Sequence, residues 1–92
     1  VMVKATVTPI PSFKLYPNPA TENVIIDYEL KERAQVSIDI FNLQGATVKT
    51  IKKISAAGTQ RINISVGDLQ PGMYLVRISA NGASETKKLH IF

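Results

Sequence analysis

The chain alternates between apolar and polar side chains along Val24-Ile25-Ile26-Asp27-Tyr28-Glu29-Leu30. Every second residue from Val24 to Leu30 is apolar, so these side chains share one face of an extended segment, and the two carboxylates lie on the other. β-Branched and aromatic residues dominate the stretch, as they do in strands. It therefore predicts a half-buried β-strand over residues 23–30.

The same two-residue period returns in three later stretches, Val36-Ser37-Ile38-Asp39-Ile40, Arg61-Ile62-Asn63-Ile64-Ser65-Val66 and Tyr74-Leu75-Val76-Arg77-Ile78. Turn sequences separate the alternating segments, among them Asn42-Leu43-Gln44-Gly45 and the hairpin signal Asn81-Gly82. No helical period persists for three turns. We predict about seven strands, at residues 12–16, 23–30, 35–42, 46–53, 59–66, 73–80 and 84–92.

Short strands at regular spacing favour an all-β fold, namely an immunoglobulin-like antiparallel β-sandwich, although the cysteine and tryptophan hallmarks of immunoglobulin domains are absent. The apolar positions of the alternating stretches should meet between the two sheets. The predicted central core consists of Ile26, Ile38, Ile40, Ile64, Tyr74, Val76 and Ile78.

The chain has 92 residues, of which 45% are hydrophobic, enough for the core of one small domain. It has no cysteine, no apolar run near the ~20 residues of a membrane-spanning helix, and no signal peptide at its start. Either the protein is cytosolic or a signal lies upstream; a start at Val1 rather than Met favours a piece of a longer protein. We expect residues 1–12 to be a linker or the end of an upstream domain, and residues 13–92 to be the folded domain.

The formal net charge is +4, but the basic residues are spread over several expected strands, and only Lys52-Lys53 and Lys87-Lys88 are adjacent pairs. Nucleic-acid binding would need a basic face with interleaved aromatic residues. Solvated strand faces and protected sheet edges account better for these lysines. We therefore expect no nucleic-acid partner.

Candidate catalytic groups are sparse. His90 is the single histidine, and no buried carboxylate is placed to orient it as in a catalytic triad. Asp27, Glu29 and Asp39 could approach one another if the second and third strands pair, which would suit a calcium site or, more simply, a salt-bridged face. No glycine-rich phosphate loop is present. We expect no enzyme activity, no cofactor and no metal.

A rigid corner is predicted at Leu15-Tyr16-Pro17-Asn18-Pro19-Ala20. Each proline fixes φ, removes a backbone donor and keeps the preceding residue out of the helical region. An edge strand should therefore stop here. Asn18 could bond the neighbouring backbone, make a recognition contact, or do both.

Two further positions are predicted to be structural. Gly72 should permit a tight turn after Pro71. Tyr74 should be a core residue whose hydroxyl reaches a backbone group near the surface.

Some apolar residues fall on the outward side of their predicted strands: Ile25, Phe41, Met73, Leu75 and Phe92. Outward apolar residues that gather together mark an interaction surface, whereas isolated ones carry no such meaning.

Four segments resemble, in order and spacing, the C-terminal sorting domain of type IX secretion, known as the Por secretion tail, of Bacteroidetes. They are the corner above, Val36-Ser37-Ile38-Asp39-Ile40-Phe41-Asn42-Leu43-Gln44-Gly45, Leu69-Gln70-Pro71-Gly72-Met73-Tyr74-Leu75-Val76-Arg77-Ile78 and Lys87-Lys88-Leu89-His90-Ile91-Phe92. The resemblance covers residues 13–92. The residues it points to for recognition are Tyr16, Pro17, Asn18, Pro19, Gly72, Tyr74, Lys87, Lys88, Leu89, Ile91 and Phe92.

The resemblance implies an address rather than a catalyst. The domain would follow a cargo protein through the periplasm to the outer-membrane type IX machinery, where a translocon and a shuttle protein recognise it. A cell-surface sortase would often cut within residues 1–12 and attach the cargo to the surface. Without the resemblance, a stand-alone fibronectin-like or carbohydrate-binding module or a spacer domain would explain the strands equally well. The chain has no tryptophan for a sugar-binding platform. The oligomeric state stays open.

Overall fold

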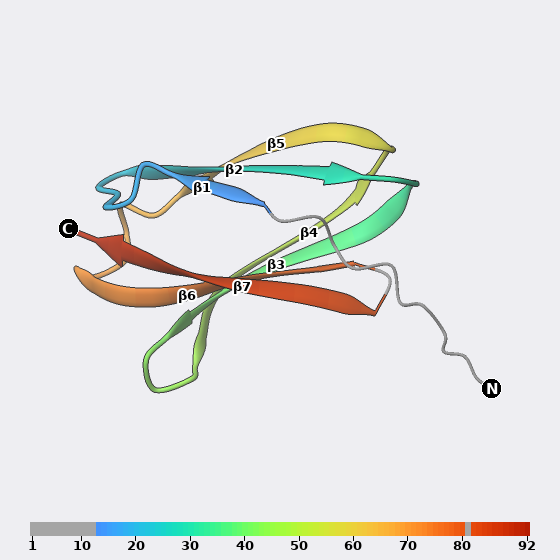
Figure 1. The fold of residues 1–92 in the computed structure, drawn as a ribbon. Coiled ribbons are helices and arrows are strands. Elements are labelled where there is room, and N and C mark those ends of the chain that lie inside the picture. Colours follow the sequence, from blue (N-terminus) through green and yellow to red (C-terminus); the bar gives the residue numbers. More distant parts are fainter. Residues whose placement is uncertain (1–12, 81) are drawn as a thin grey trace.

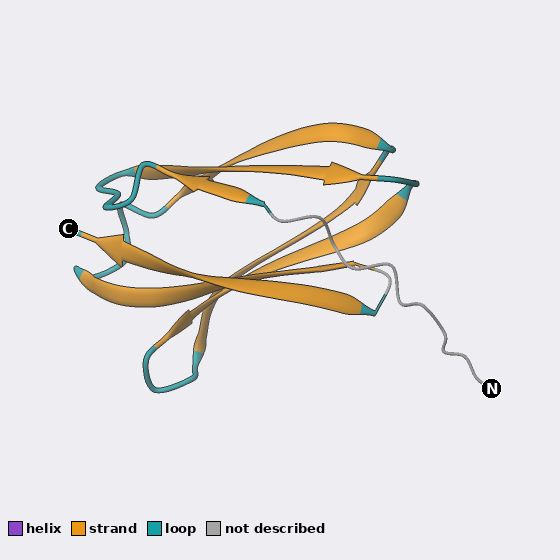
Figure 2. Cartoon of the chain, in the orientation of Figure 1, coloured by secondary structure: helices purple, strands orange, loops and turns teal. Residues whose placement is uncertain are grey.

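The computed structural model describes residues 13–80 and 82–92, which form seven β-strands in two antiparallel sheets. One sheet has the order β1-β2-β5, with β1 at Lys14–Tyr16, β2 at Asn23–Leu30 and β5 at Gly58–Ser65. The other has the order β4-β3-β6-β7, with β3 at Ala34–Asn42, β4 at Thr47–Ser55, β6 at Gly72–Ala80 and β7 at Ala83–Ile91. Figure 1 shows the two layers, and Figure 2 shows short turns joining the strands.

The predicted seven strands and the immunoglobulin-like sandwich are confirmed, and no strand boundary differs by more than two residues from the prediction. The turn residues also behave as predicted: Gly45 and Gly82 have φ of 90° and 80°, values that glycine adopts without steric strain. Asn81 lies outside the described residues, as does the assignment of residues 1–12. The described part of the chain contains no helix with the length and hydropathy needed to cross a membrane.

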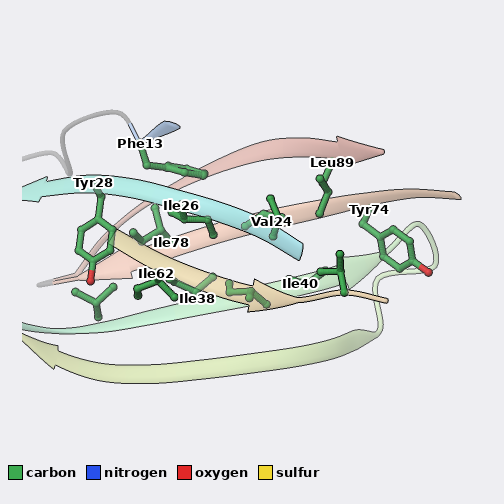
Figure 3. Packing of buried hydrophobic residues seen from close by; sticks show 14 of the residues in the cluster. Phe13, Val24, Ile26, Tyr28, Ile38, Ile40, Ile62, Tyr74, Ile78 and Leu89 are labelled. Carbon is green, nitrogen blue, oxygen red and sulfur yellow. The ribbon is translucent and has the colours of Figure 1, made fainter. Parts of the chain in front are cut away.

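The inward positions of both sheets form one core (Figure 3). All seven residues predicted at its centre are buried. Along β3 the pairs Ile38↔Ile51 and Ile38↔Ile78 place Ile38 in the middle of its sheet, and it faces the other layer with 1% of its surface exposed. Leu69, from the loop before β6, packs against the core from one end.

Tyr74 anchors the crossing between the two sheets. Its ring is buried, and its hydroxyl donates a 2.6 Å hydrogen bond to the main-chain oxygen of Gln70, four residues upstream. This matches the tyrosine corner of immunoglobulin-like sandwiches, in which a tyrosine near the start of the sixth strand bonds back to the preceding loop. The prediction for Tyr74 is thus confirmed.

The predicted approach of Asp27, Glu29 and Asp39 is wrong, because β2 and β3 lie in different sheets. Asp27 instead pairs with Arg61 on β5, and Asp39 pairs with Arg77 on β6. Because the chain passes from one sheet to the other between β2 and β3, both strands keep their alternation of inward and outward residues, but they are not paired with each other. Among the described residues, no group of three or more acidic, histidine or cysteine side chains is placed to hold a metal ion.

Candidate recognition site

The proline corner joins β1 to β2 within one sheet and contacts the edge of the other sheet on the way. β1 pairs with β2 and ends at Tyr16. Both X–Pro bonds that follow, Tyr16-Pro17 and Asn18-Pro19, are cis. Ala20 then forms a parallel bridge with Ile91, at the end of β7 in the opposite sheet. In Figure 1 the C end of the chain accordingly lies beside the loop that joins β1 to β2.

Four hydrogen bonds join this corner to the outer edge of β7. The Asn18 side chain donates from Nδ2 to the Lys88 main-chain oxygen (3.2 Å) and accepts at Oδ1 from the His90 N–H (3.0 Å). The Ala20 N–H donates to the His90 oxygen (2.8 Å), and the Phe92 N–H donates to the Ala20 oxygen (2.9 Å). We call this contact of Asn18 and Ala20 with Lys88, His90 and Phe92 the clasp.

Asn18 therefore acts as a substitute for a peptide unit. Its carboxamide presents one donor and one acceptor to β7, as a backbone residue of a neighbouring strand would. The prediction that Asn18 bonds the neighbouring backbone is wrong in its partner, because its partners lie 70 and 72 residues away. A carboxamide is required for both bonds, which explains the choice of asparagine between two prolines that have no N–H to offer.

Replacing Asn18 with alanine is expected to lower the free energy of unfolding by about 1–2 kcal/mol, since it removes two hydrogen bonds at a solvent-accessible edge. Asn18→Asp should also destabilise, because the carboxylate keeps the bond from the His90 N–H but cannot donate to the Lys88 oxygen. Urea denaturation measures both. Asn63→Ala, at an exposed position on β5, is the control and should change stability by less than about 0.5 kcal/mol. Equal effects for Asn18→Ala and Asn63→Ala would contradict a stabilising clasp.

The family-like segment around Gly72 reaches β7 from the side opposite the clasp. The register pairs Gly72 with Ile91, Met73 with His90 and Tyr74 with Leu89. Gly72 has a φ of 150°, which admits the turn into β6 and bears out the prediction for this glycine. The last five residues of the chain thus lie between the proline corner and the start of β6.

Three of the predicted recognition residues lie in the core, namely Tyr74, described above, Leu89 and Ile91. Leu89 and Ile91 are 0% and 1% exposed, so the expectation that their side chains dock on a partner does not fit the folded domain. The apolar run at the end of the chain alternates, and its inward half fills the sandwich. Lys88 and Phe92 are exposed, on the outward side. β7 lies at the edge of its sheet, with the clasp covering its final residues.

Lys87 points to the inward side of β7, near the margin of the sandwich. Its ammonium lies 5.5 Å from the centre of the Phe13 ring, close enough for a cation–π contact. Phe13 is 1% exposed, so this contact joins Lys87 to a ring of the core. The structure places the two adjacent lysines on opposite sides of the strand, and Lys88 is the one that faces solvent.

An apolar surface lies on the outer face of the four-stranded sheet, next to the clasp. Phe41 pairs with Leu75, and Met73 pairs with His90. The His90 and Phe92 rings meet edge to face, with their centroids 4.6 Å apart. We call these five residues the aromatic patch. Of the five outward apolar residues predicted from the sequence, four belong to it. Ile25 does not, because it lies on β2 in the other sheet.

Tyr16, another predicted recognition residue, takes part in a charged cluster on the three-stranded sheet. Its hydroxyl donates to Asp27 Oδ2 at 2.7 Å, and Arg61 Nε donates to Asp27 Oδ1 at 2.8 Å. The hydrogen bonds from Arg61 and then from Tyr16 hold the pKa of Asp27 below its ordinary value, and the bond to Asp27 raises the pKa of Tyr16. This cluster ties β1 to β2 and β5, beside the start of the corner.

We expect acid to weaken the domain partly through Asp27. Because its folded-state pKa is lowered, its stabilising contribution is present above the unfolded value of about 4 and is lost as the pH falls through the folded value. Urea denaturation at a series of pH values should show a smaller loss of stability on acidification for Asp27→Asn than for the wild type. The pKa of Asp68 is also lowered, by its hydrogen bond from Lys49. Because Asp68 is present in both proteins, its contribution cancels from the difference in stability between Asp27→Asn and the wild type. Identical slopes below about pH 4 would contradict the assignment.

Ala20 and His90 are site residues that sequence reasoning did not select. Ala20 is completely buried, and both of its main-chain groups bond to β7. His90 supplies its backbone to the clasp and its ring to the aromatic patch. Backbone contacts do not depend on the type of side chain, so the sequence does not indicate them directly. The position of Ala20 directly after the second proline was nevertheless a usable signal that it belongs to the corner.

A family model of the secretion system C-terminal sorting domain matches residues 14–92. A search of the curated proteins finds no match. A domain of this family is a sorting signal rather than a catalyst; it interacts with the secretion machinery and implies export to the cell surface or secretion. The match covers most of the chain, including the corner, the Gly72 segment and the terminal strand, and the chain therefore belongs to the C-terminal sorting domains of type IX secretion.

Proposed function

We propose that this domain directs a cargo protein, carried on its N-terminal side, from the periplasm across the outer membrane. Its partners are the translocon and the shuttle protein of the type IX machinery. The recognised surface comprises the clasp, with exposed Asn18, Lys88 and Phe92, and the start of β6, where Gly72 pairs with Ile91 on the other side of β7. Buried Leu89 and Ile91 support that surface from below.

The meeting of the corner with the terminal strand carries this proposal. Residues 18 and 20 bond to residues 88, 90 and 92, so two segments from opposite ends of the chain form one surface. The Gly72 segment lies along the same strand from its other side. Such a surface exists only when the domain is folded. A receptor that binds it would read the folded state rather than a linear tag.

We further propose that a cell-surface sortase removes the domain by cutting within residues 1–12. Phe13 is the first described residue and is 1% exposed, so the described core includes it. A protease needs several extended residues around the bond that it cuts. A cut on the N-terminal side of Phe13 leaves the core intact, which supports this placement.

The proposal is tested by fusing residues 1–92 to a monomeric reporter with a periplasmic signal peptide, in a bacterium that has type IX secretion. The reporter should reach the cell surface or the medium, and it should stay in the periplasm in a strain that lacks the translocon. The reporter without the domain is the matched control. Periplasmic retention of the folded fusion in the competent strain would contradict the proposal and favour a stand-alone binding module. Mass spectrometry of the exported reporter locates the cut.

A further inference from the structure

The outer face of the four-stranded sheet is divided into a polar end and an apolar end. At the end away from the clasp its outward residues are mostly small or polar, namely Gln35, Ser37, Lys52, Ser79 and Ser84, with Ile54 as an exposed apolar exception. Arg77, Asp39 and Thr50 form a hydrogen-bonded row in the middle. The aromatic patch occupies the other end. The stability of the sheet does not require apolar side chains at this end, because polar side chains occupy outward positions of the same sheet a few residues away.

The aromatic patch has the composition of a protein interface. Aromatic residues and methionine are enriched where proteins bind one another, and a few such anchors supply most of the binding energy. Phe92 is 64% exposed and Met73 is 37% exposed, while Phe41 and Leu75 are half-buried and give the patch a firm floor. Phe92, supported edge-on by His90, is the residue that projects furthest.

One cation beside the patch has no acidic partner among the described residues. Lys88 is exposed and pairs in register with Leu75, and its ammonium makes no ion pair or hydrogen bond with the described residues. Arg77 lies 4.8 Å from the centre of the Phe41 ring and also bonds to Asp39. A carboxylate on a partner would therefore find a ready cation in Lys88.

We propose that the aromatic patch binds a component of the secretion machinery that offers an apolar depression bordered by carboxylates, with Phe92 as the anchor and Lys88 as the orienting charge. This proposal rests on the proposed function and identifies the chemistry of the partner. A lipid surface fits less well, since binding to an anionic membrane takes a cluster of about four or more basic residues. Here Lys88 is the one uncommitted cation among the described residues at the patch.

The reporter fusion described above, carried through the type IX-competent strain, tests the patch with two pairs of matched substitutions. Phe92→Ser is compared with Ile54→Ser, because Ile54 is 61% exposed at the far end of the same sheet. Lys88→Glu is compared with Lys52→Glu, which makes the same change of charge at the polar end. We expect each patch variant to lower the initial rate of export about tenfold, as for the loss of an interface anchor, and each control to export normally.

Folding is measured separately on the purified variants by thermal unfolding, and all four should keep the wild-type midpoint. A pair whose patch member unfolds is replaced by Met73→Thr with Leu75→Thr. Export of the wild-type fusion together with normal export of folded patch variants would overturn the inference and leave the proposed function standing. Equal loss for Lys88→Glu and Lys52→Glu would also overturn it, since net charge alone would then matter. Failure of the wild-type fusion itself to be exported would instead refute the proposed function.

The membrane alternative is tested with vesicles of phosphatidylglycerol and phosphatidylethanolamine. The purified wild-type domain should stay in the supernatant when the vesicles are sedimented. Sedimentation of the wild type but not of Phe92→Ser would assign the patch to a lipid surface and overturn the proposal of a protein partner.

Discussion

Replacing Ile38 with alanine is expected to lower the free energy of unfolding by about 2–5 kcal/mol, the range for truncating a large aliphatic side chain in a packed core. Ile38 is 1% exposed and lies between Ile51 and Ile78 in its sheet, so its truncation would leave a cavity in the core. Domains of this size have a total stability of about 5–15 kcal/mol. The substitution should therefore remove a large fraction of it in urea denaturation.

Ile54→Ala provides the control for this experiment. Ile54 has the same side chain but is 61% exposed on β4, so its truncation should change stability by less than about 0.5 kcal/mol. A loss below about 0.5 kcal/mol for Ile38→Ala would mean that the inward face of β3 is assigned wrongly.

Removal of residues 88–92 is expected to abolish cooperative folding. It takes Leu89 and Ile91 from the core, at about 1.5–3 kcal/mol each, and removes the clasp with its four hydrogen bonds at about 1 kcal/mol each. Together these losses approach the whole stability of a small domain. Circular dichroism and thermal scans should show no unfolding transition for the shortened chain.

This deletion must be distinguished from loss of recognition alone. Lys88→Ala with Phe92→Ala removes the exposed side chains of the same segment and leaves Leu89, Ile91 and the backbone contacts of the clasp in place. We expect the double variant to fold and to be exported poorly. A cooperatively folded protein lacking residues 88–92 would show that β7 does not contribute to the core as described.

The strands and their inward faces were predictable, because a two-residue period directly records which side of a strand is buried. Ile26, Ile38 and Val76 are examples. The neighbours of each strand were not predictable, since alternation is the same whichever strand lies beside it. Asp27 and Asp39 were expected to meet on this basis, and they lie in different sheets, each beside an arginine.

The candidate site was predictable in its segments but not in its contacts. The two prolines predicted a corner. The sequence around Asn18, however, does not indicate that its carboxamide bonds to Lys88 and His90. The family resemblance assigned recognition to Leu89 and Ile91, and they could be assigned to the core only after the second sheet was in place. Tyr74 was foreseen correctly because its phenol has both an apolar body and a polar tip that must find a partner.

The clasp also determines when the domain can finish folding. Because residues 18 and 20 bond to residues 88–92, the start of the domain cannot complete its contacts until residues 88–92 have been made. Pairings so distant in sequence also form slowly, since a long loop must close, at a cost in entropy, before the stabilising contacts form. A nascent or truncated chain therefore lacks the finished surface, and an export apparatus that binds the clasp would ignore incomplete products. The bonds between Asn18 and β7 thus distinguish a domain with a complete β7 from one that lacks it.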